Sequence, residues 1–121
     1  MTAKGSSAAH TRLVHDILAE IGALPGVVAA ANPSGVAHYV SRSGKPYRVT
    51  YGFPGGEGGP DVLVVARGML LGIECKTGKA TTTKEQRACH AALRAVGVVV
   101  HVVRTVEEAR AALLAVVEGC P

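Results

Sequence analysis

The chain has 121 residues, of which 48% are hydrophobic and 3% aromatic, and its formal net charge is +4. This length predicts one domain over residues 1–121 with an aliphatic core, and the composition excludes a disordered chain. No apolar run reaches the roughly 18 residues that cross a bilayer and no signal segment is evident, so we expect a cytoplasmic protein. Cys75, Cys89 and Cys120 lack a CxxC spacing, which predicts buried or incidental thiols.

The first half of the chain predicts a helix, a strand and a hairpin. Ser6 or Ser7 can cap a helix that ends near Gly22, with apolar residues recurring at the helical period from Leu13 to Ile21. Residues 27–31 predict a first strand. The extended segments 38–41 and 47–51 predict a protruding hairpin with a basic cluster, made of Arg42, Lys45 and Arg48.

The stretch that follows, after a glycine-rich loop, predicts a second hairpin with polar residues at one end. The apolar runs 62–66 and 69–73 flank a two-residue turn. In this register Asp61 lies opposite Glu74, and the period of two puts Lys76 on the same face. Directly opposed Cβ atoms lie about 5 Å apart, so the two carboxylates can hold one hard cation.

The last part of the chain predicts a helix, a strand and a helix. A capping box that begins at Thr82 or at Thr83 predicts a helix to about Val96. Residues 98–103 form a continuous apolar strand, which we expect to be covered on both faces. A second capping box at Thr105 predicts the last helix. The resulting order is an α/β fold with a mixed central sheet flanked by helices.

Two carboxylates and a lysine at the end of an apolar hairpin suggest phosphoryl chemistry. Mg²⁺ prefers oxygen ligands, and it can polarise a phosphoryl oxygen and stabilise charge on the leaving oxygen. Lys76 could then orient the attacking water or offset charge on the phosphate. The alternative is a plain ion pair between Glu74 and Lys76 at a strand end.

The order of the motifs resembles the VRR-NUC domain of the PD-(D/E)xK nuclease superfamily over roughly residues 28–115. The matching stretches are Asn32-Pro33-Ser34-Gly35, Tyr51-Gly52, Gly59-Pro60-Asp61, Ile73-Glu74-Cys75-Lys76-Thr77, Gln86 and Val102-Val103-Arg104. The resemblance implies a restriction-endonuclease-like αβββαβ core and a Mg²⁺- or Mn²⁺-dependent endonuclease acting on DNA. Small stand-alone domains of this kind are often phage-encoded, are similar to Holliday-junction resolvases and work as homodimers, which would place the protein in the host cytoplasm.

The resemblance also implies roles for single residues. Asp61 and Glu74 would bind the metal, the backbone carbonyl of Cys75 would complete the coordination, and Lys76 would be catalytic. Gln86 matches a glutamine that supports the metal's outer shell or the attacking water. Alternatively, Gln86 is simply a capping-box residue.

The chain departs from the family on its first helix, where a glutamate normally helps to bind metal. Here the position with the best helical phase is His10, three residues before Leu13. A histidine could ligate a divalent ion, or it could be a partly buried structural residue. Glu20 is a poorer substitute because of its phase, and Asp16 faces away from the buried stripe.

The net positive charge of the chain is typical of a protein with a polyanionic partner. The residues expected to bind DNA are Asn32, Ser34, Arg42, Lys45, Arg48, Lys79, Lys84 and Arg87. Because aromatic residues are few and stacking platforms therefore scarce, we expect contacts to phosphates, recognition of DNA shape, steep salt dependence and little sequence preference. His90 shares a helix face with Arg87 and Arg94, which predicts a residue that is solvated or faces DNA.

Three functions stay open at this point. The first is a structure-specific endonuclease that resolves Holliday junctions as a homodimer. The second is a flap, nick or restriction-type nuclease of the same fold. The third is a catalytically impaired module that binds DNA structures, in which the altered first helix has removed activity.

Overall fold

The computed structural model describes residues 7–55 and 58–119, so the expectations for Ser6 and Cys120 lie outside the described residues. The elements in chain order are α1 (Ala8–Gly22), β1 (Val27–Ala31), β2 (Gly35–Val40), β3 (Pro46–Tyr51), β4 (Val62–Ala66), β5 (Met69–Cys75), α2 (Lys84–Ala95), β6 (Val99–Val103) and α3 (Val106–Val117). This order confirms the predicted α/β fold with an inserted hairpin. None of the described helices is long and apolar enough to cross a membrane.

The main sheet is mixed, as predicted, with the strand order β1-β4-β5-β6. β1 and β4 lie antiparallel, β4 and β5 form the predicted hairpin, and β5 and β6 lie parallel. The hairpin register runs from Ala66 opposite Met69 to Val62 opposite Ile73, which confirms the predicted pairing. Its turn at residues 67–68 has positive φ at both positions, which suits the right-handed twist of a two-residue hairpin.

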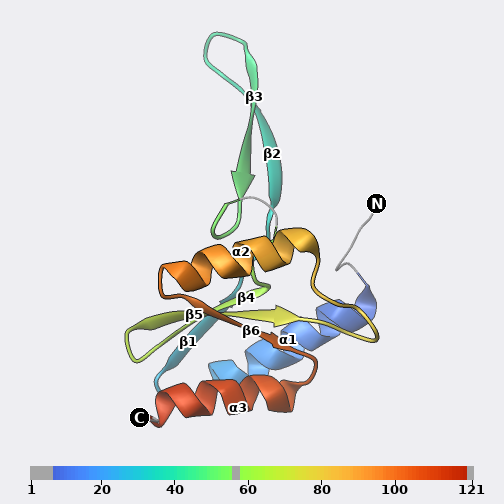
Figure 1. Ribbon diagram of the computed structural model, residues 1–121. Coiled ribbons are helices and arrows are strands. Elements are labelled where there is room, and N and C mark those ends of the chain that lie inside the picture. The colour runs from blue at the N-terminus through green and yellow to red at the C-terminus, as the bar shows by residue number, and fades with distance from the viewer. Residues whose placement is uncertain (1–6, 56–57, 120–121) are drawn as a thin grey trace.

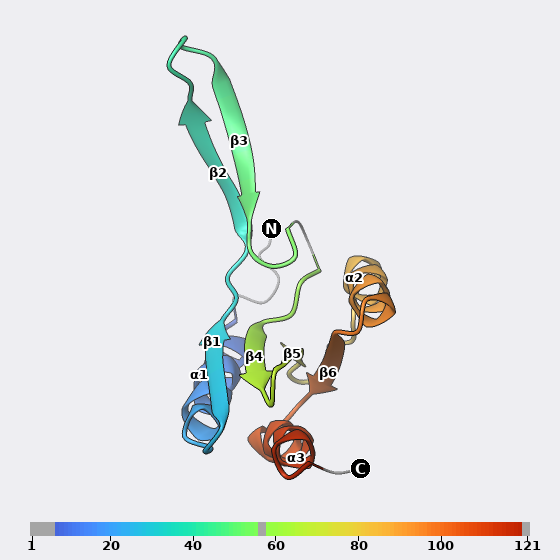
Figure 2. The same ribbon diagram turned by 90° about the vertical axis from the view of Figure 1, so that its left-hand side faces the viewer.

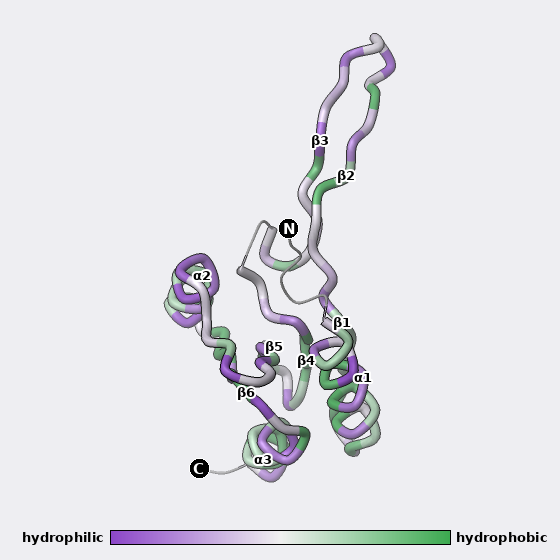
Figure 3. The backbone as a smooth tube through the Cα atoms, turned by 90° about the vertical axis from the view of Figure 1, so that its right-hand side faces the viewer, coloured by the Kyte–Doolittle hydropathy of each residue, from purple (hydrophilic) through white to green (hydrophobic). Residues whose placement is uncertain are grey.

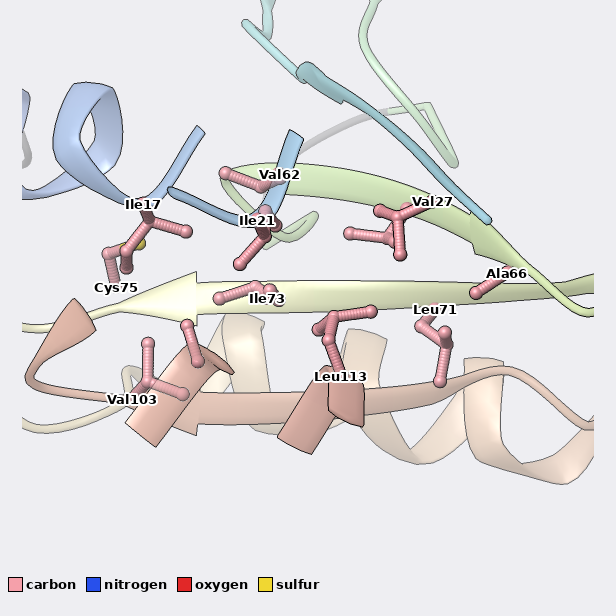
Figure 4. Packing of buried hydrophobic residues seen from close by; sticks show 12 residues of the cluster. Ile17, Ile21, Val27, Val62, Ala66, Leu71, Ile73, Cys75, Val103 and Leu113 are labelled. Carbon is pink, nitrogen blue, oxygen red and sulfur yellow. The ribbon is translucent and has the colours of Figure 1, made fainter. Parts of the chain in front are cut away.

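The helices cover the two faces of this sheet unequally. α1 and α3 lie together on one face, and α2 lies over the other face (Figures 1 and 2). The hydrophobic core forms between the sheet and the pair α1 and α3, where Ile17, Ile21 and Leu113 pack against Val62 and Ile73 (Figure 4). All five side chains are fully buried aliphatic residues, as expected for a chain without tryptophan.

The expectation that both faces of the last strand are covered is wrong. β6 is an edge strand, and Val99 and Val102 are 41% and 46% exposed. Val65 on β4 is also exposed, because α2 packs against β6 and leaves part of its face of the sheet open. An apolar run therefore predicts a strand here without predicting its position in the sheet.

A side-chain cap begins each helix. The structure decides between the two predicted caps of α2, and the predicted capping box of α3 is incomplete. The Ser7 hydroxyl accepts a hydrogen bond from the backbone N–H of His10 and caps α1. At α2 the full capping box forms between Thr83 and Gln86, rather than at Thr82. At α3 the Thr105 hydroxyl caps the helix, but the Glu108 carboxylate accepts from the N–H of Arg104 instead of closing the box.

The hairpin of β2 and β3, which we call the arm (Gly35–Tyr51), projects away from the body of the domain (Figures 1 and 2). Its strands form a separate two-stranded sheet. The first strand begins three residues earlier than the predicted start at His38. Hydrophilic residues flank the tip of the arm (Figure 3), where the basic Arg42 and Lys45 lie.

Replacement of Gly72 tests how the sheet positions the start of β4. A Cβ atom at Gly72 would lie 2.7 Å from Cγ of Pro60 and 3.2 Å from Cγ2 of Val100. Because both neighbours are buried, we expect Gly72→Ala to lower the free energy of unfolding by about 1–3 kcal/mol, as measured by denaturant unfolding. At Gly22, where a Cβ would meet nothing within 4 Å, the control Gly22→Ala should not destabilise. Equal losses in both variants would contradict this account.

Candidate active site

A cavity of about 520 Å³ opens between α1, α2 and the ends of β4 and β5. Five of the residues that the sequence singled out for chemistry line it: His10, Asp61, Glu74, Lys76 and Gln86. His10 comes from α1, Asp61 directly precedes β4, and Gln86 lies in α2. The two carboxylates, the lysine, the histidine and the amide therefore converge from segments distant in sequence.

Glu74 is the most deeply buried polar residue of this group, with only 1% of its surface exposed. Its position on β5 points it away from the aliphatic core and toward α2, because its neighbours Ile73 and Cys75 face that core. Its Oε2 atom accepts a hydrogen bond of 3.0 Å from Nε2 of Gln86. Its Oε1 atom is buried and has no hydrogen-bond partner among the described residues.

Burial of Glu74 changes its proton affinity. Desolvation, followed by the negative charge of Asp61, raises the pKa of the Glu74 carboxyl from 4.5 to about 8, and the nearby Lys76 opposes this shift. Without a cation, the carboxyl therefore holds a proton at neutral pH. A divalent cation beside both carboxylates would favour the ionised form and take the place of that proton.

Gln86 connects the helix cap to the charged groups. Its Oε1 atom accepts hydrogen bonds from Nζ of Lys76 at 2.7 Å and from the backbone N–H of Thr83 at 2.9 Å. Lys76 Nζ lies farther from Glu74 Oε2, at 3.8 Å. The capping role and the site role of Gln86 thus coexist, and the amide links Glu74 to Lys76 more closely than their direct ion pair does.

Asp61 is held from two sides. Its Oδ2 atom accepts a hydrogen bond of 2.8 Å from the backbone N–H of Cys75 and lies 3.3 Å from Nε2 of His10. The helical phase of His10 thus brings its ring to the cavity, as the sequence predicts. Glu20 instead forms an ion pair with Arg110 of α3, away from the cavity.

His90 is where the sequence interpretation fails. It is neither solvated nor DNA-facing, because only 6% of its surface is exposed. Its Nε2 atom lies 3.6 Å from Oε1 of Glu74, and burial lowers its pKa, so the ring is neutral at physiological pH. The missed signal is its spacing: His90 follows Gln86 by four residues and so shares the inner face of α2.

Asn32 has a structural role beside the cavity. Its side-chain nitrogen donates to the carbonyl oxygens of Phe53 and Pro60, each at 2.8 Å, and its side-chain oxygen accepts from the N–H of Phe53. Its backbone N–H donates to the carbonyl oxygen of Asp61. Both ends of the amide are occupied within the chain, so Asn32 ties the base of the arm to the segment that carries Asp61.

The remaining residues expected to bind DNA lie around the cavity and along the arm. Ser34 lines the cavity where the arm begins. Lys79 and Lys84 are exposed near the loop that borders it, and the Arg87 guanidinium donates to the carbonyl oxygen of Thr82. The exposed basic residues of the arm are Arg42, Lys45 and Arg48.

The donor set fits a hard divalent cation. Asp61 and Glu74 offer carboxylate oxygens, and Cys75 lines the same cavity. Oε1 of Glu74 has no hydrogen-bond partner in the described part of the chain. Within residues 7–55 and 58–119, no three His, Cys, Asp or Glu side chains come close enough to hold a metal by themselves. A cation here would thus combine two carboxylates with backbone and solvent oxygens, as Mg²⁺ commonly does.

Comparison with solved structures identifies the fold. A structure described as "VRR_NUC domain" matches 88% of this chain and 96% of its own chain, with a TM-score of 0.58 and 20% sequence identity. The chain has the VRR-NUC fold. No protein-family model matches the sequence, and no curated protein matches it. The mixed sheet flanked by helices agrees with the predicted restriction-endonuclease-like core.

The proton on Glu74 gives the metal-free protein a pH dependence. Because the folded-state pKa lies near 8 and the unfolded value near 4.5, protonation favours folding. This contribution is complete below pH 4.5 and is lost as the pH rises through about 8. We expect the free energy of unfolding of the wild type to fall by a few kcal/mol over this pH range, since one pKa unit corresponds to about 1.4 kcal/mol. In Glu74→Gln, whose amide does not titrate, this fall should be absent.

The measurement is denaturant unfolding in EDTA between pH 5 and pH 9. The control Glu85→Gln, which changes an exposed carboxylate on α2, should keep the wild-type pH dependence. Parallel pH profiles for the wild type and Glu74→Gln would contradict the assigned protonation.

Proposed function

We propose that this protein is a divalent-metal-dependent endodeoxyribonuclease that hydrolyses DNA phosphodiester bonds. The observation that carries the proposal is the buried Glu74 carboxylate beside the carboxylate of Asp61, with a pKa near 8 and one oxygen that no described residue hydrogen-bonds. A fold that keeps two acids together at this cost in solvation provides a place for a cation. The VRR-NUC fold supports the same reaction class by analogy.

Each group in the cavity has a separate task in this proposal. Asp61 and Glu74, with the Cys75 carbonyl, would hold Mg²⁺ or Mn²⁺. When bound, the cation supplies charge stabilisation at the phosphate and at the leaving oxygen. Lys76 places a positive, hydrogen-bonding group beside the carboxylates, where it offsets negative charge that develops on the phosphate. Gln86 fixes the position of that lysine through the 2.7 Å hydrogen bond.

The charge around the cavity supports DNA as the substrate. Lys76 lines the cavity, and Lys79 and Lys84 are exposed in the segment that follows it. The basic arm begins directly after Ser34, which also lines the cavity. Neutralising several phosphates in this way gives affinity that falls steeply with salt. We propose branched DNA, and Holliday junctions in particular, as the preferred substrate. A homodimer would let two sites cut opposed strands through twofold symmetry.

Two alternative functions predict different results in a cleavage assay. A flap, nick or restriction-type nuclease would use the same cavity on other DNA structures. A catalytically impaired binding module is favoured by one observation, namely that α1 places a histidine, His10, beside Asp61, where the resemblance implies a glutamate. Among the described residues, Asp61 and Glu74 are the acidic side chains that line the cavity.

The decisive experiment incubates labelled four-way junctions, flaps and linear duplexes with the protein in Mg²⁺, Mn²⁺ or EDTA. We expect symmetric nicks in the junction with either metal and no cleavage in EDTA. Preferential cleavage of flaps or duplex would favour the second function. Binding of all substrates without cleavage in any metal would leave only the binding module.

The variants Asp61→Ala and Glu74→Ala test the assigned residues in the same assay. Each should reduce cleavage by at least about 10³-fold, because each removes a metal ligand, while junction affinity measured by anisotropy changes little. The control Asp16→Ala, which removes an exposed carboxylate of α1 outside the cavity, should leave cleavage unchanged. Wild-type cleavage by either site variant would refute the assigned site.

Replacement of His10 tests whether this histidine supports the metal. His10→Ala removes the partner of Asp61, so we expect the metal concentration for half-maximal cleavage to rise by about 10- to 100-fold. Metal binding measured by calorimetry should weaken in parallel, whereas the melting temperature of the metal-free protein should change little. The control His15→Ala alters an exposed residue of the same helix. Unchanged metal dependence would assign His10 a structural role only.

A further inference from the structure

The arm gathers every tyrosine of the chain on one face. The sequence contains three tyrosines, and the register pairs Tyr39 with Tyr47 and places Tyr51 opposite Gly35. Opposed residues of an antiparallel pair share a face, as do residues two apart along a strand, so all three rings lie on one side. We call this surface, completed by Val49, the tyrosine face.

The tyrosine face is exposed and preorganised. Tyr39, Tyr47 and Tyr51 are 51%, 49% and 48% exposed. The rings of Tyr39 and Tyr47 stack with centroids 5.6 Å apart and an angle of 27° between their planes. The Tyr51 ring lies over the backbone of Gly35, where a Cβ atom would meet its hydroxyl at 2.6 Å. Aromatic surface that is ordered but not used by the core indicates a binding surface.

The charge of the arm selects the kind of partner. Residues 35–51 contain three basic side chains and no acidic one. Arg42 and Lys45 lie at the tip of the arm, and Arg48, which pairs with His38, lies on the face opposite the tyrosines. Two copies of the arm facing each other would bring like charges together, which opposes self-association through this surface. A polyanion with flat apolar rings, which is a nucleic acid, complements both the charge and the tyrosines.

The arm also starts at the edge of the cavity. Ser34, directly before β2, lines the cavity, and Gly52, directly after β3, lies against Ser34. Asn32 fastens this base to the segment that carries Asp61. The strands of the arm extend about 20 Å at 3.4 Å per residue. A DNA strand that leaves the cavity can therefore continue along the tyrosine face.

We propose that the tyrosine face is a stacking platform for unpaired bases of branched DNA next to the site of cleavage, whether these belong to a single-stranded flap or become unpaired at the crossover of a junction. Bases inside a duplex stack on one another, whereas unpaired bases offer a free ring face to an aromatic side chain. The identity of the polyanion as DNA rests on the proposed function. This proposal differs from the expectation that stacking platforms are scarce, because the three tyrosines are concentrated at one place.

Tyrosine fluorescence provides a direct readout. The chain has no tryptophan and its three tyrosines all lie on the arm, so tyrosine emission reports on this face alone. The wild-type protein in EDTA is titrated with three DNA ligands. The first is a flap with a single-stranded thymine tail, the second is the same flap with abasic sites in the tail, and the third is a blunt duplex. We expect quenching by the first ligand and little by the other two, although the abasic flap has the same number of phosphates.

Variants separate stacking from charge. Tyr39→Ala should weaken binding of the thymine flap by about 5- to 100-fold, as expected for the loss of one stacked base, and leave binding of the blunt duplex unchanged. Tyr39→Phe, which keeps the ring, should retain affinity. Val36→Ala on the opposite face is the matched control. Arg42→Ala should weaken binding of all three ligands to a similar degree.

Equal affinity and equal quenching for the thymine and abasic flaps would overturn the proposal. It would also be overturned if sedimentation showed a dimer that Tyr39→Ala dissociates, because a second copy would then cover the tyrosine face. The outcome is distinguishable from failure of the proposed function: base-dependent quenching without cleavage in any metal would remove only the nuclease assignment. Metal-dependent cleavage without base-dependent quenching would remove only the stacking platform.

Discussion

Burial of the Glu74 carboxylate beneath α2 is the constraint on which the rest of the site depends. Removing an ionised carboxylate from water costs several kcal/mol unless its oxygens are partnered. Gln86 donates a hydrogen bond to one oxygen, while the other lies 3.6 Å from Nε2 of His90 and has no hydrogen bond from the residues that the structure describes. The fold bears this cost because its core, between the sheet and the pair α1 and α3, is made of closely packed aliphatic side chains that need no polar partner.

The sequence predicts most of the fold wherever local patterns decide it. The helical period sets α1 and the direction of His10, and the turn at residues 67–68 sets the register that brings Asp61 close to Glu74. The edge position of β6 and the burial of His90 depend on how distant elements dock, which no local pattern contains. The choice of Thr83 over Thr82 as the cap also depends on a distant contact, because Gln86 reaches Lys76 from that position.

Average composition conceals the arrangement of the arm. With an aromatic content of 3%, the chain is expected to have little stacking surface. Because side chains alternate along a strand, however, Tyr39, Tyr47 and Tyr51 all lie on one side of the arm. The distribution of charge has the same character, since the arm carries basic residues and no acidic ones. Asn32 joins the arm to the segment that carries Asp61, so the arm and the cavity share one hydrogen-bonded connection.

The double use of Gln86 makes the first turn of α2 part of the hydrogen-bond network of the cavity. Helix ends open more readily than helix centres, because fewer contacts hold them. When the turn that begins at Thr83 unwinds, the Gln86 amide leaves both Lys76 and Glu74, and the lysine loses its closest fixed partner. Opening of this helix end and loss of the ordered charge arrangement are thus one cooperative event. The residues that cap α2 therefore also hold the hydrogen bonds of the cavity in place.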